Sequence, residues 1–152
     1  MSSICIIKYK QNCKNSESIL KKIIKQKAES FGIGVFFPKN EQPLIPIEGK
    51  ECLISLADSN QFDNCERLLL PDDCYYNGYG NSVSFVQRME MISNIIYVVL
   101  HKSDRVELFV GDLGEYTISE FEYEKISFEE FTSYMCSHFN RIDICAKHLE
   151  IT

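Results

Sequence analysis

The chain has 152 residues, of which 45% are hydrophobic and 25% are charged, and its net charge at pH 7 is −6. These values are typical of one globular domain with a core of its own, and they exclude a disordered chain. The charge is uneven: residues 1–50 carry nine Lys against four Glu, a net +5, whereas residues 51–152 carry seven Lys or Arg against eighteen acidic residues, a net −11. The acidic part would repel phosphates, which argues against nucleic acid as the main ligand and favours a basic protein partner.

The sequence predicts a cytoplasmic protein that does not bind a membrane. The N-terminus "MSSICIIKYKQN" lacks the apolar length and the small-residue cleavage site of a signal peptide. The longest apolar run, from Ile95 to Leu100, is too short to span a bilayer. Seven cysteines at irregular spacing, without a C-x-x-C pair, are typical of reduced core residues and surface thiols.

The first third of the chain predicts three strands and a helix. Strands are expected in "SICIIKY", "IGVFF" and "ECLISLA", which are rich in β-branched residues. A helix is expected over residues 15–32, capped by Asn15 or Ser16 and ended by Gly32. Its apolar stripe comprises Ile19, Leu20, Ile23, Ile24, Ala28 and Phe31, with Lys21, Lys22, Lys25 and Lys27 among its polar positions.

Further elements are predicted after residue 81. A helix begins near Ser82 or Ser84, with a buried stripe of Val86, Met89, Ile92, Ile96 and Val99, and either helix or strand suits its last residues, "IIYVVL". Residues 104–126 predict a hairpin that turns at "GDLG", with a bulge or a strand break near Ser119, where the apolar alternation changes parity. Ser127 and Glu130 form a capping box for a last helix, and "RIDICAKHLEI" is a final strand or helix. We therefore expect a single α+β domain over residues 1–152, a mainly antiparallel sheet packed with about three helices.

The sequence contains no clear motif for catalysis or for metal binding. Cys136, His138, Cys145 and His148 lie within thirteen positions, but no knuckle that would bring zinc ligands together is evident. The chain has no G-x-S-x-G nucleophile elbow and no P-loop or dinucleotide fingerprint. We therefore predict no catalytic residue, metal or cofactor. The alternative is a small Cys/His-dependent enzyme or a metal-binding factor that processes nucleic acid.

The stretch "SEFEYEKIS" carries the main candidate site. Read as a strand, it places Glu120, Glu122 and Glu124 on one face and Phe121 and Tyr123 on the other. The carboxylates could keep an exposed sheet soluble and guard its edge, or they could dock a basic partner. The second interpretation requires that they share one face and are not neutralised by the protein's own lysines. The further candidates for partner binding are acidic residues and tyrosines nearby in the sequence: Asp72, Asp73, Asp112, Glu115, Tyr75, Tyr76, Tyr79 and Tyr116.

The order of elements in the last two thirds resembles a known class of proteins. The helix "SFVQRMEMISNIIYVVL", the strands "RVELFVGD" and "SEFEYEKIS" and the capped helix "FEEFTSYM" are similar in layout to the small immunity proteins of bacterial polymorphic toxin systems, including the contact-dependent growth inhibition class. The resemblance implies a single-domain, acidic, non-catalytic inhibitor that caps one cognate toxin domain, often a nuclease with a basic cleft. The basic first helix departs from this pattern and would have to face away from such a toxin. A generic adaptor or regulatory subunit remains a further alternative.

Overall fold

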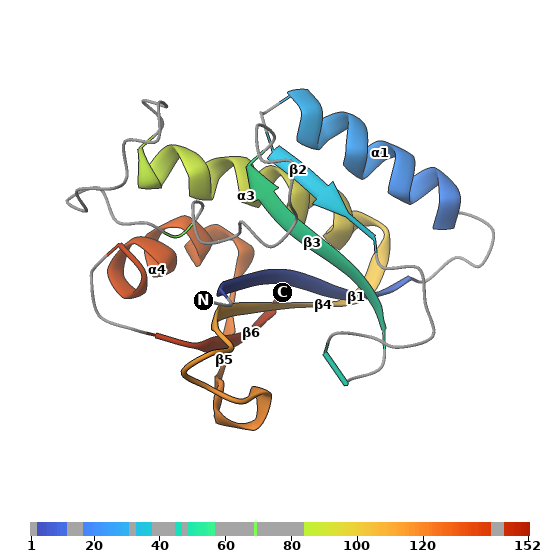
Figure 1. The fold of residues 1–152 in the computed structure, drawn as a ribbon. Helices are drawn as coiled ribbons and strands as arrows, with labels where there is room; N and C mark the ends of the chain where they lie inside the picture. Colours follow the sequence, from blue (N-terminus) through green and yellow to red (C-terminus); the bar gives the residue numbers. More distant parts are fainter. Residues whose placement is uncertain are drawn as a thin grey trace.

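A computed structural model describes residues 3–11, 17–30, 33–37, 45–46, 49–56, 69, 84–140 and 145–152. Its strands are β1 (Ser3–Gln11), β2 (Ile33–Phe36), β3 (Lys50–Leu56), β4 (Ser103–Asp112), β5 (Glu122–Ile126) and β6 (Lys147–Ile151). Its longer helices are α1 (Glu17–Ser30), α3 (Phe85–His101) and α4 (Phe131–His138), and two single-turn 3-10 helices are η3 (Ile118–Glu120) and η4 (Phe128–Glu130). The predicted α+β fold with a mainly antiparallel sheet is confirmed (Figure 1).

The six strands form one sheet in the order β2-β3-β1-β4-β6-β5. Neighbouring strands are antiparallel except for β5 and β6, which are parallel, with Glu122 opposite Lys147 and Ile126 opposite Ile151. The two central strands pair along most of their length, from Ser3 opposite Asp112 to Gln11 opposite Ser103. The sheet therefore has two edges in the described residues, β2 at one end and β5 at the other.

The hairpin predicted over residues 104–126 is wrong. Strand β4 pairs with β1 and β6, and β6 separates it from β5. The chain does turn after β4, where the N–H groups of Glu115 and Tyr116 donate to the Asp112 carbonyl at 3.2 and 3.0 Å. It then forms η3 instead of returning along β4, and β5 runs through α4 into β6, a connection that joins parallel strands. The break in alternation near Ser119 therefore marks the end of one segment and not a bulge within a strand.

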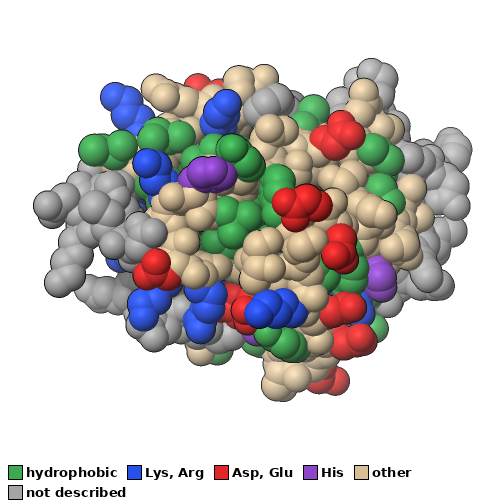
Figure 2. Space-filling view, turned by 180° about the vertical axis from the view of Figure 1, so that it is seen from behind, with side chains coloured by type: hydrophobic (Ala, Val, Ile, Leu, Met, Phe, Trp, Pro, Cys, Tyr) green, Lys and Arg blue, Asp and Glu red, His purple; other side chains and the backbone are tan. Residues whose placement is uncertain are grey.

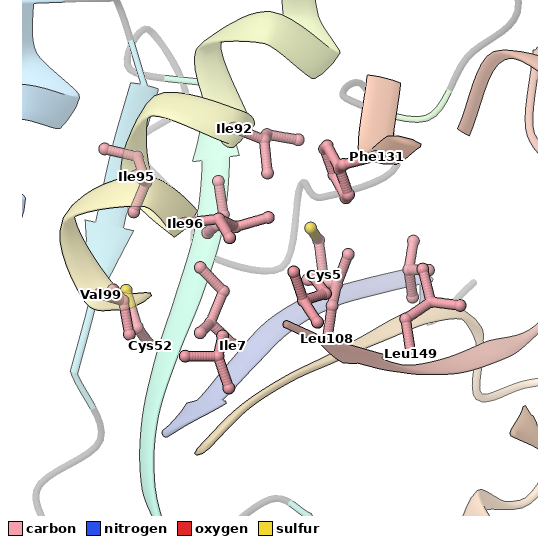
Figure 3. Packing of buried hydrophobic residues seen from close by; sticks show 14 of the residues in the cluster. Cys5, Ile7, Cys52, Ile92, Ile95, Ile96, Val99, Leu108, Phe131 and Leu149 are labelled. Carbon is pink, nitrogen blue, oxygen red and sulfur yellow. The ribbon is translucent and has the colours of Figure 1, made fainter. Parts of the chain in front are cut away.

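The helices α1, α3 and α4 contribute to one core with one face of the sheet. Figure 3 shows Ile92, Ile95, Ile96 and Val99 of α3 above strand residues that include Ile7 and Leu108. Helix α3 begins after Ser84, whose hydroxyl accepts from the Gln87 N–H at 3.2 Å, and it stays helical through "IIYVVL". The predicted stripe is confirmed except at Val86, which is 41% exposed while Phe85 is buried. The predicted cap and end residues of α1, Asn15, Ser16 and Gly32, lie outside the described residues. Within its predicted stripe Leu20, Ile24 and Ala28 are buried and Ile19 is exposed.

The last helix and the last strand agree in part with the sequence. Ser127 and Glu130 are hydrogen-bonded through their side chains at 3.0 Å, but Ser127 precedes η4 and Glu130 is its last residue, and α4 begins only at Phe131. Of the two states left open for "RIDICAKHLEI", residues 147–151 adopt the strand.

The opposite face of the sheet has a smaller core of its own. It contains Ile6, Ile45, Phe109, Phe121 and Ala146, which are all buried. Beside it lies a buried charged pair, in which Lys8 Nζ is 3.3 Å from Glu51 Oε2.

Candidate functional site

The three glutamates of "SEFEYEKIS" do not form the single row that the sequence predicted. Glu120 is the last residue of η3 and lies before the strand, whereas Glu122 and Glu124 belong to β5. The Glu120 carboxylate accepts hydrogen bonds from the Thr117 N–H and hydroxyl, both at 2.9 Å. These bonds lower the pKa of Glu120, the backbone N–H contributing most. Glu120 is thus exposed, and its carboxylate caps the start of η3 by accepting the Thr117 N–H.

Glu122 and Glu124 share one cation of the protein itself. Lys147 Nζ is 2.9 Å from Glu122 Oε1 and 4.0 Å from Glu124 Oε2, and the Lys147 side chain is only 7% exposed. The hydrogen bond and charge of Lys147 lower the pKa of Glu122. The requirement that the protein's own lysines leave these carboxylates uncompensated is therefore not met. One cation for two carboxylates leaves a net charge of −1, and the Glu122 side chain is still 72% exposed.

Glu124 is also tied to α4. Its carboxylate accepts a hydrogen bond from the Tyr134 hydroxyl, and burial, followed by this bond, raises the pKa of Tyr134. The Tyr134 ring in turn stacks on His138 with ring centroids 4.0 Å apart. Glu124 therefore has a structural role in joining β5 to α4, and it is the least available of the three glutamates.

The other face of β5 carries a residue that the sequence did not single out as an anchor. Tyr123 is 55% exposed, and its hydroxyl donates to Glu150 Oε1 at 2.7 Å, a bond that raises the pKa of Tyr123. Lys125 lies on the same face, with Nζ 3.8 Å from Glu150 Oε2. Tyr123 is rigid, amphipathic and exposed on an edge strand, which suits it to an interface.

Behind Tyr123 lies a histidine–carboxylate pair. The His148 Nε2 atom contacts Glu107 Oε2, and Arg105 Nε lies 2.9 Å from Glu107 Oε1. The His148 ring stacks on Phe109 at 4.1 Å between centroids and meets the edge of Tyr123 at 5.1 Å. Such pairs orient an imidazole in acid–base sites. In this chain the contacts join β4, β6 and β5, and they support the exposed ring of Tyr123.

The remaining sequence candidates divide into three groups. Glu115 is exposed, and Asp112 is half-buried with its carboxylate accepting from the Gly114 N–H at 2.7 Å. Tyr116 was expected to be an interface anchor, but it is half-buried and packs on the smaller core. The third group, Asp72, Asp73, Tyr75, Tyr76 and Tyr79, lies outside the described residues.

The four residues considered as zinc ligands do not come together. Cys136 and His138 are on α4 and Cys145 precedes β6, whereas His148 points to the other face of the sheet, against Phe109. Among the residues that the structure describes, no three His, Cys, Asp or Glu side chains are placed to hold a metal ion. The geometry thus gives no support to the alternative of a metal site built from these side chains.

The charges of the protein are separated along the sheet. Helix α1 packs beside β2, and the ammonium groups of Lys21 and Lys25 lie 5.4 and 6.0 Å from the centre of the Phe37 ring, next to that edge. The acidic residues around β5 lie at the opposite edge, five strand spacings or roughly 24 Å away. Figure 2 shows a separation of this kind on one face, where most Lys and Arg side chains lie in one half and most Asp and Glu in the other. The basic helix therefore does face away from the acidic edge.

One feature of the sequence could have revealed the pairing of Lys147 with the glutamates. Lys147 alternates with Leu149 and Ile151, so the strand periodicity places a lysine on an apolar face, where it needs a carboxylate partner. The position of Tyr123 on the other face of β5 was predicted, because Tyr123 alternates with Glu122 and Glu124.

Comparisons of the chain with family models, with curated proteins and with solved structures found no match. In the described parts of the chain, no helix has the length and apolar character needed to cross a membrane.

Proposed function

We propose that this protein is a cytoplasmic immunity protein that binds a cognate bacterial toxin domain, such as a nuclease, and neutralises it by covering its basic surface. The observation that carries the proposal is the charge separation between the two edges of the sheet. Exposed carboxylates gather around β5, at Glu115, Glu120, Glu122, Glu129 and Glu130, while the lysines of α1 lie at the far edge. A basic partner is attracted to one end of this molecule and repelled from the other, so the charges also orient it.

The β5 end combines this potential with preformed contacts. The Glu122 carboxylate is already positioned by Lys147, and the Tyr123 ring by Glu150 and His148. Groups held in place lose little side-chain entropy when a partner binds. An inhibitor that must capture a toxin before it acts benefits from both fast association and a rigid surface.

A generic adaptor could bind a basic partner through the same surface. The two functions are distinguished by whether binding neutralises the toxin. The proposal expects a toxin domain to be encoded directly upstream of the gene; that domain is co-expressed with the chain, and bacterial growth is measured. We expect growth to be restored, and the two purified proteins to form a stoichiometric complex. Continued growth arrest in the presence of the folded protein would contradict the proposal, whereas binding without protection would favour an adaptor.

The surface itself is tested with two charge-matched triple variants. The first, E115Q/E120Q/E129Q, removes three exposed carboxylates around β5; Glu122 and Glu124 are left unchanged because they hold Lys147 and Tyr134. The control, K22Q/K25Q/K27Q, removes three exposed lysines from α1 at the other edge. We expect the first variant to slow association with the toxin domain about tenfold at low salt, and the control to leave it unchanged or faster. Equal rates for the two variants would rule out the β5 end as the docking surface.

A further inference from the structure

The outer edge of β5 has main-chain groups that point away from the sheet. In the parallel pair, the Glu122 N–H donates to the Ala146 carbonyl, and the Thr152 N–H donates to the Ile126 carbonyl, both at 3.1 Å. Residues of a parallel strand alternate in the direction of their N–H and C=O groups. Because Glu122 and Ile126 direct these groups to β6, Tyr123 and Lys125 direct theirs outward.

This edge is extended, and two of its residues have exposed side chains. The backbone dihedrals remain extended at Phe121 and Ser127, so the extended segment runs over 121–127, roughly 20 Å or slightly more. Tyr123 is 55% exposed, and the side chain of Lys125 is 61% exposed. In the part of the chain that the structure describes, no strand pairs with β5 on this side.

Edge strands in soluble proteins are commonly blocked by proline, by a bulge or by charge. Strand β5 contains no proline, and its pairing with β6 has no shift of register. The charged side chains of β5 are the remaining obstacle to pairing, and they disfavour some incoming strands more than others. If a second copy paired with it antiparallel about its centre, Glu124 would face Glu124 of that copy, and like charges directly opposite one another are destabilising.

A strand of the opposite charge pattern meets no such barrier. Glu122 and Glu124 lie on the helix side of β5, and their two carboxylates share the single ammonium of Lys147. Lys or Arg at alternate positions of an incoming strand would lie beside them, since side chains of neighbouring strands meet on the same face. On the other face, Tyr123 and Lys125 would accept an apolar and an acidic residue.

We propose that the outer edge of β5 binds an extended segment of the partner, with Lys or Arg at alternate positions, which adds to the sheet as a further strand. This inference rests on the proposed function and specifies how the same surface binds. The main-chain hydrogen bonds of Tyr123 and Lys125 supply affinity, and Glu122 and Glu124 select the cations.

The test uses a short synthetic peptide in which Lys and Thr alternate, and a control peptide of the same composition in which all Lys precede all Thr. Amide hydrogen exchange of the wild-type protein is measured by NMR with each peptide. We expect the alternating peptide to slow exchange at Tyr123 and Lys125 selectively, and the block peptide to do so much less. Equal protection by both peptides, or none at these two amides, would overturn the inference.

Two substitutions at one position separate the main chain from the side chain. Lys125→Pro removes an outward N–H that β6 does not use, while Lys125→Gln removes the charge and keeps the N–H. We expect Lys125→Pro to weaken peptide binding about tenfold, from one lost hydrogen bond and a steric clash, and Lys125→Gln to change it less than about threefold. Unchanged binding by a folded Lys125→Pro variant would overturn the inference. If that variant fails to fold, the exchange measurement on the wild-type protein still decides.

The outcomes also distinguish this inference from the proposed function. A toxin domain that binds and is neutralised while Tyr123 and Lys125 remain unprotected would leave the proposed function in place and overturn only the strand addition. If the alternating peptide selectively slows exchange at these amides but the protein does not rescue cells from the toxin, the strand addition would stand and the proposed function would be overturned. Concentration-dependent dimerisation that protects the same two amides would assign the edge to a second copy of the chain and would overturn the inference.

Discussion

Lys147 stands directly opposite Glu122 in the parallel pair of β6 and β5, and its ammonium lies 2.9 Å from the Glu122 carboxylate. Lys147 is 6% exposed, although Glu122 is mostly in solvent. The pair thus places a buried cation beneath an exposed acidic edge. The lysine limits the repulsion between Glu122 and Glu124, and the ion pair joins the acidic side chain of β5 to β6.

The first prediction concerns the pH dependence of this pair. Lys147 lowers the pKa of Glu122 in the folded state below the ordinary value of 4.5, so the unfolded chain binds more protons in acid. The stabilisation is present above about pH 4.5 and is lost as the pH falls through the lower folded pKa. We expect Lys147→Met to be less stable than wild type at pH 7, with a difference that shrinks in acid. Urea denaturation at pH 7 and at pH 3.5 measures this difference.

The control for this experiment is Lys125→Met, the same substitution at an exposed lysine 3.8 Å from Glu150. Exposed pairs of this kind contribute little to stability. The urea midpoint of Lys125→Met should therefore match that of wild type at pH 7 and at pH 3.5. A Lys147→Met difference that stays constant with pH would assign the effect to packing and not to the charge on Glu122.

The strands and helices were predictable because their apolar periodicity is strong. The buried stripe of Met89, Ile92, Ile96 and Val99 fixed α3, and the alternation of Val106, Leu108 and Val110 fixed β4. The pairing of β5 was not predictable in the same way. Periodicity tells which residues of a strand share a face, but it does not tell which strand lies alongside.

The prediction that the three glutamates form one row was wrong for a related reason. Glu120, Glu122 and Glu124 alternate in sequence as if on one strand, but strand assignment by alternation cannot place the first residue of β5. The Thr117–Glu120 cap takes Glu120 out of the strand. Lys147, which follows Glu122 by 25 residues in the sequence, reaches the other two glutamates only because α4 brings β6 beside β5. Contacts of this range depend on the tertiary fold.

The second prediction concerns the buried charges on the other face of the sheet. Lys8 is 1% exposed, and its ammonium lies 3.2 Å from the carbonyls of Ile45 and Gly49 as well as 3.3 Å from Glu51. Lys8→Met leaves Glu51 charged and buried without its cation. We expect a loss of about 3–5 kcal/mol in the free energy of unfolding, measured by urea denaturation.

The matched variant is Lys8→Met with Glu51→Leu, which removes both charges. Replacing a whole buried pair by apolar residues is often neutral. The Glu51 carboxylate also accepts from the Ile45 N–H at 2.7 Å, so recovery should be partial. A double variant no more stable than Lys8→Met would show that the lysine acts through the carbonyls of Ile45 and Gly49 and not by neutralising Glu51.

The third prediction concerns the start of α3. Ser84 and Gln87 cap each other's backbone N–H groups at 2.9 and 3.2 Å. Ser84→Ala leaves one of these donors without its partner and should cost about 1 kcal/mol of stability. Ser93→Ala in the middle of the same helix is the control, because Ser93 only bonds back to the Glu90 carbonyl and alanine favours the helix. Thermal unfolding should show a lower midpoint for the first variant alone, and equal midpoints would contradict the role of the cap.

The fourth prediction concerns the contact between β4 and the start of β6. Gly111 has a φ of 152°, and a Cβ atom there would lie 2.7 Å from the Ala146 Cα and 3.0 Å from the Cys145 carbonyl oxygen. Those neighbours are main chain and cannot rotate away, so Gly111→Ala must push β6 from β4 as well as strain its own backbone. We expect the free energy of unfolding to fall by about 1–3 kcal/mol, measured by urea denaturation.

Gly114→Ala is the matched control in the turn that follows β4. A Cβ atom there would meet only the side chain of Asp112, whose nearest atom is a carboxylate oxygen at 3.0 Å, and that side chain can move. Its stability should stay within about 0.5 kcal/mol of wild type. Because β6 carries Lys147, Gly111→Ala should also displace the ammonium from Glu122 and make the amides of β5 exchange faster. A variant that loses stability while its β5 amides keep wild-type exchange would show that the β5–β6 pair is independent of the β4 contact.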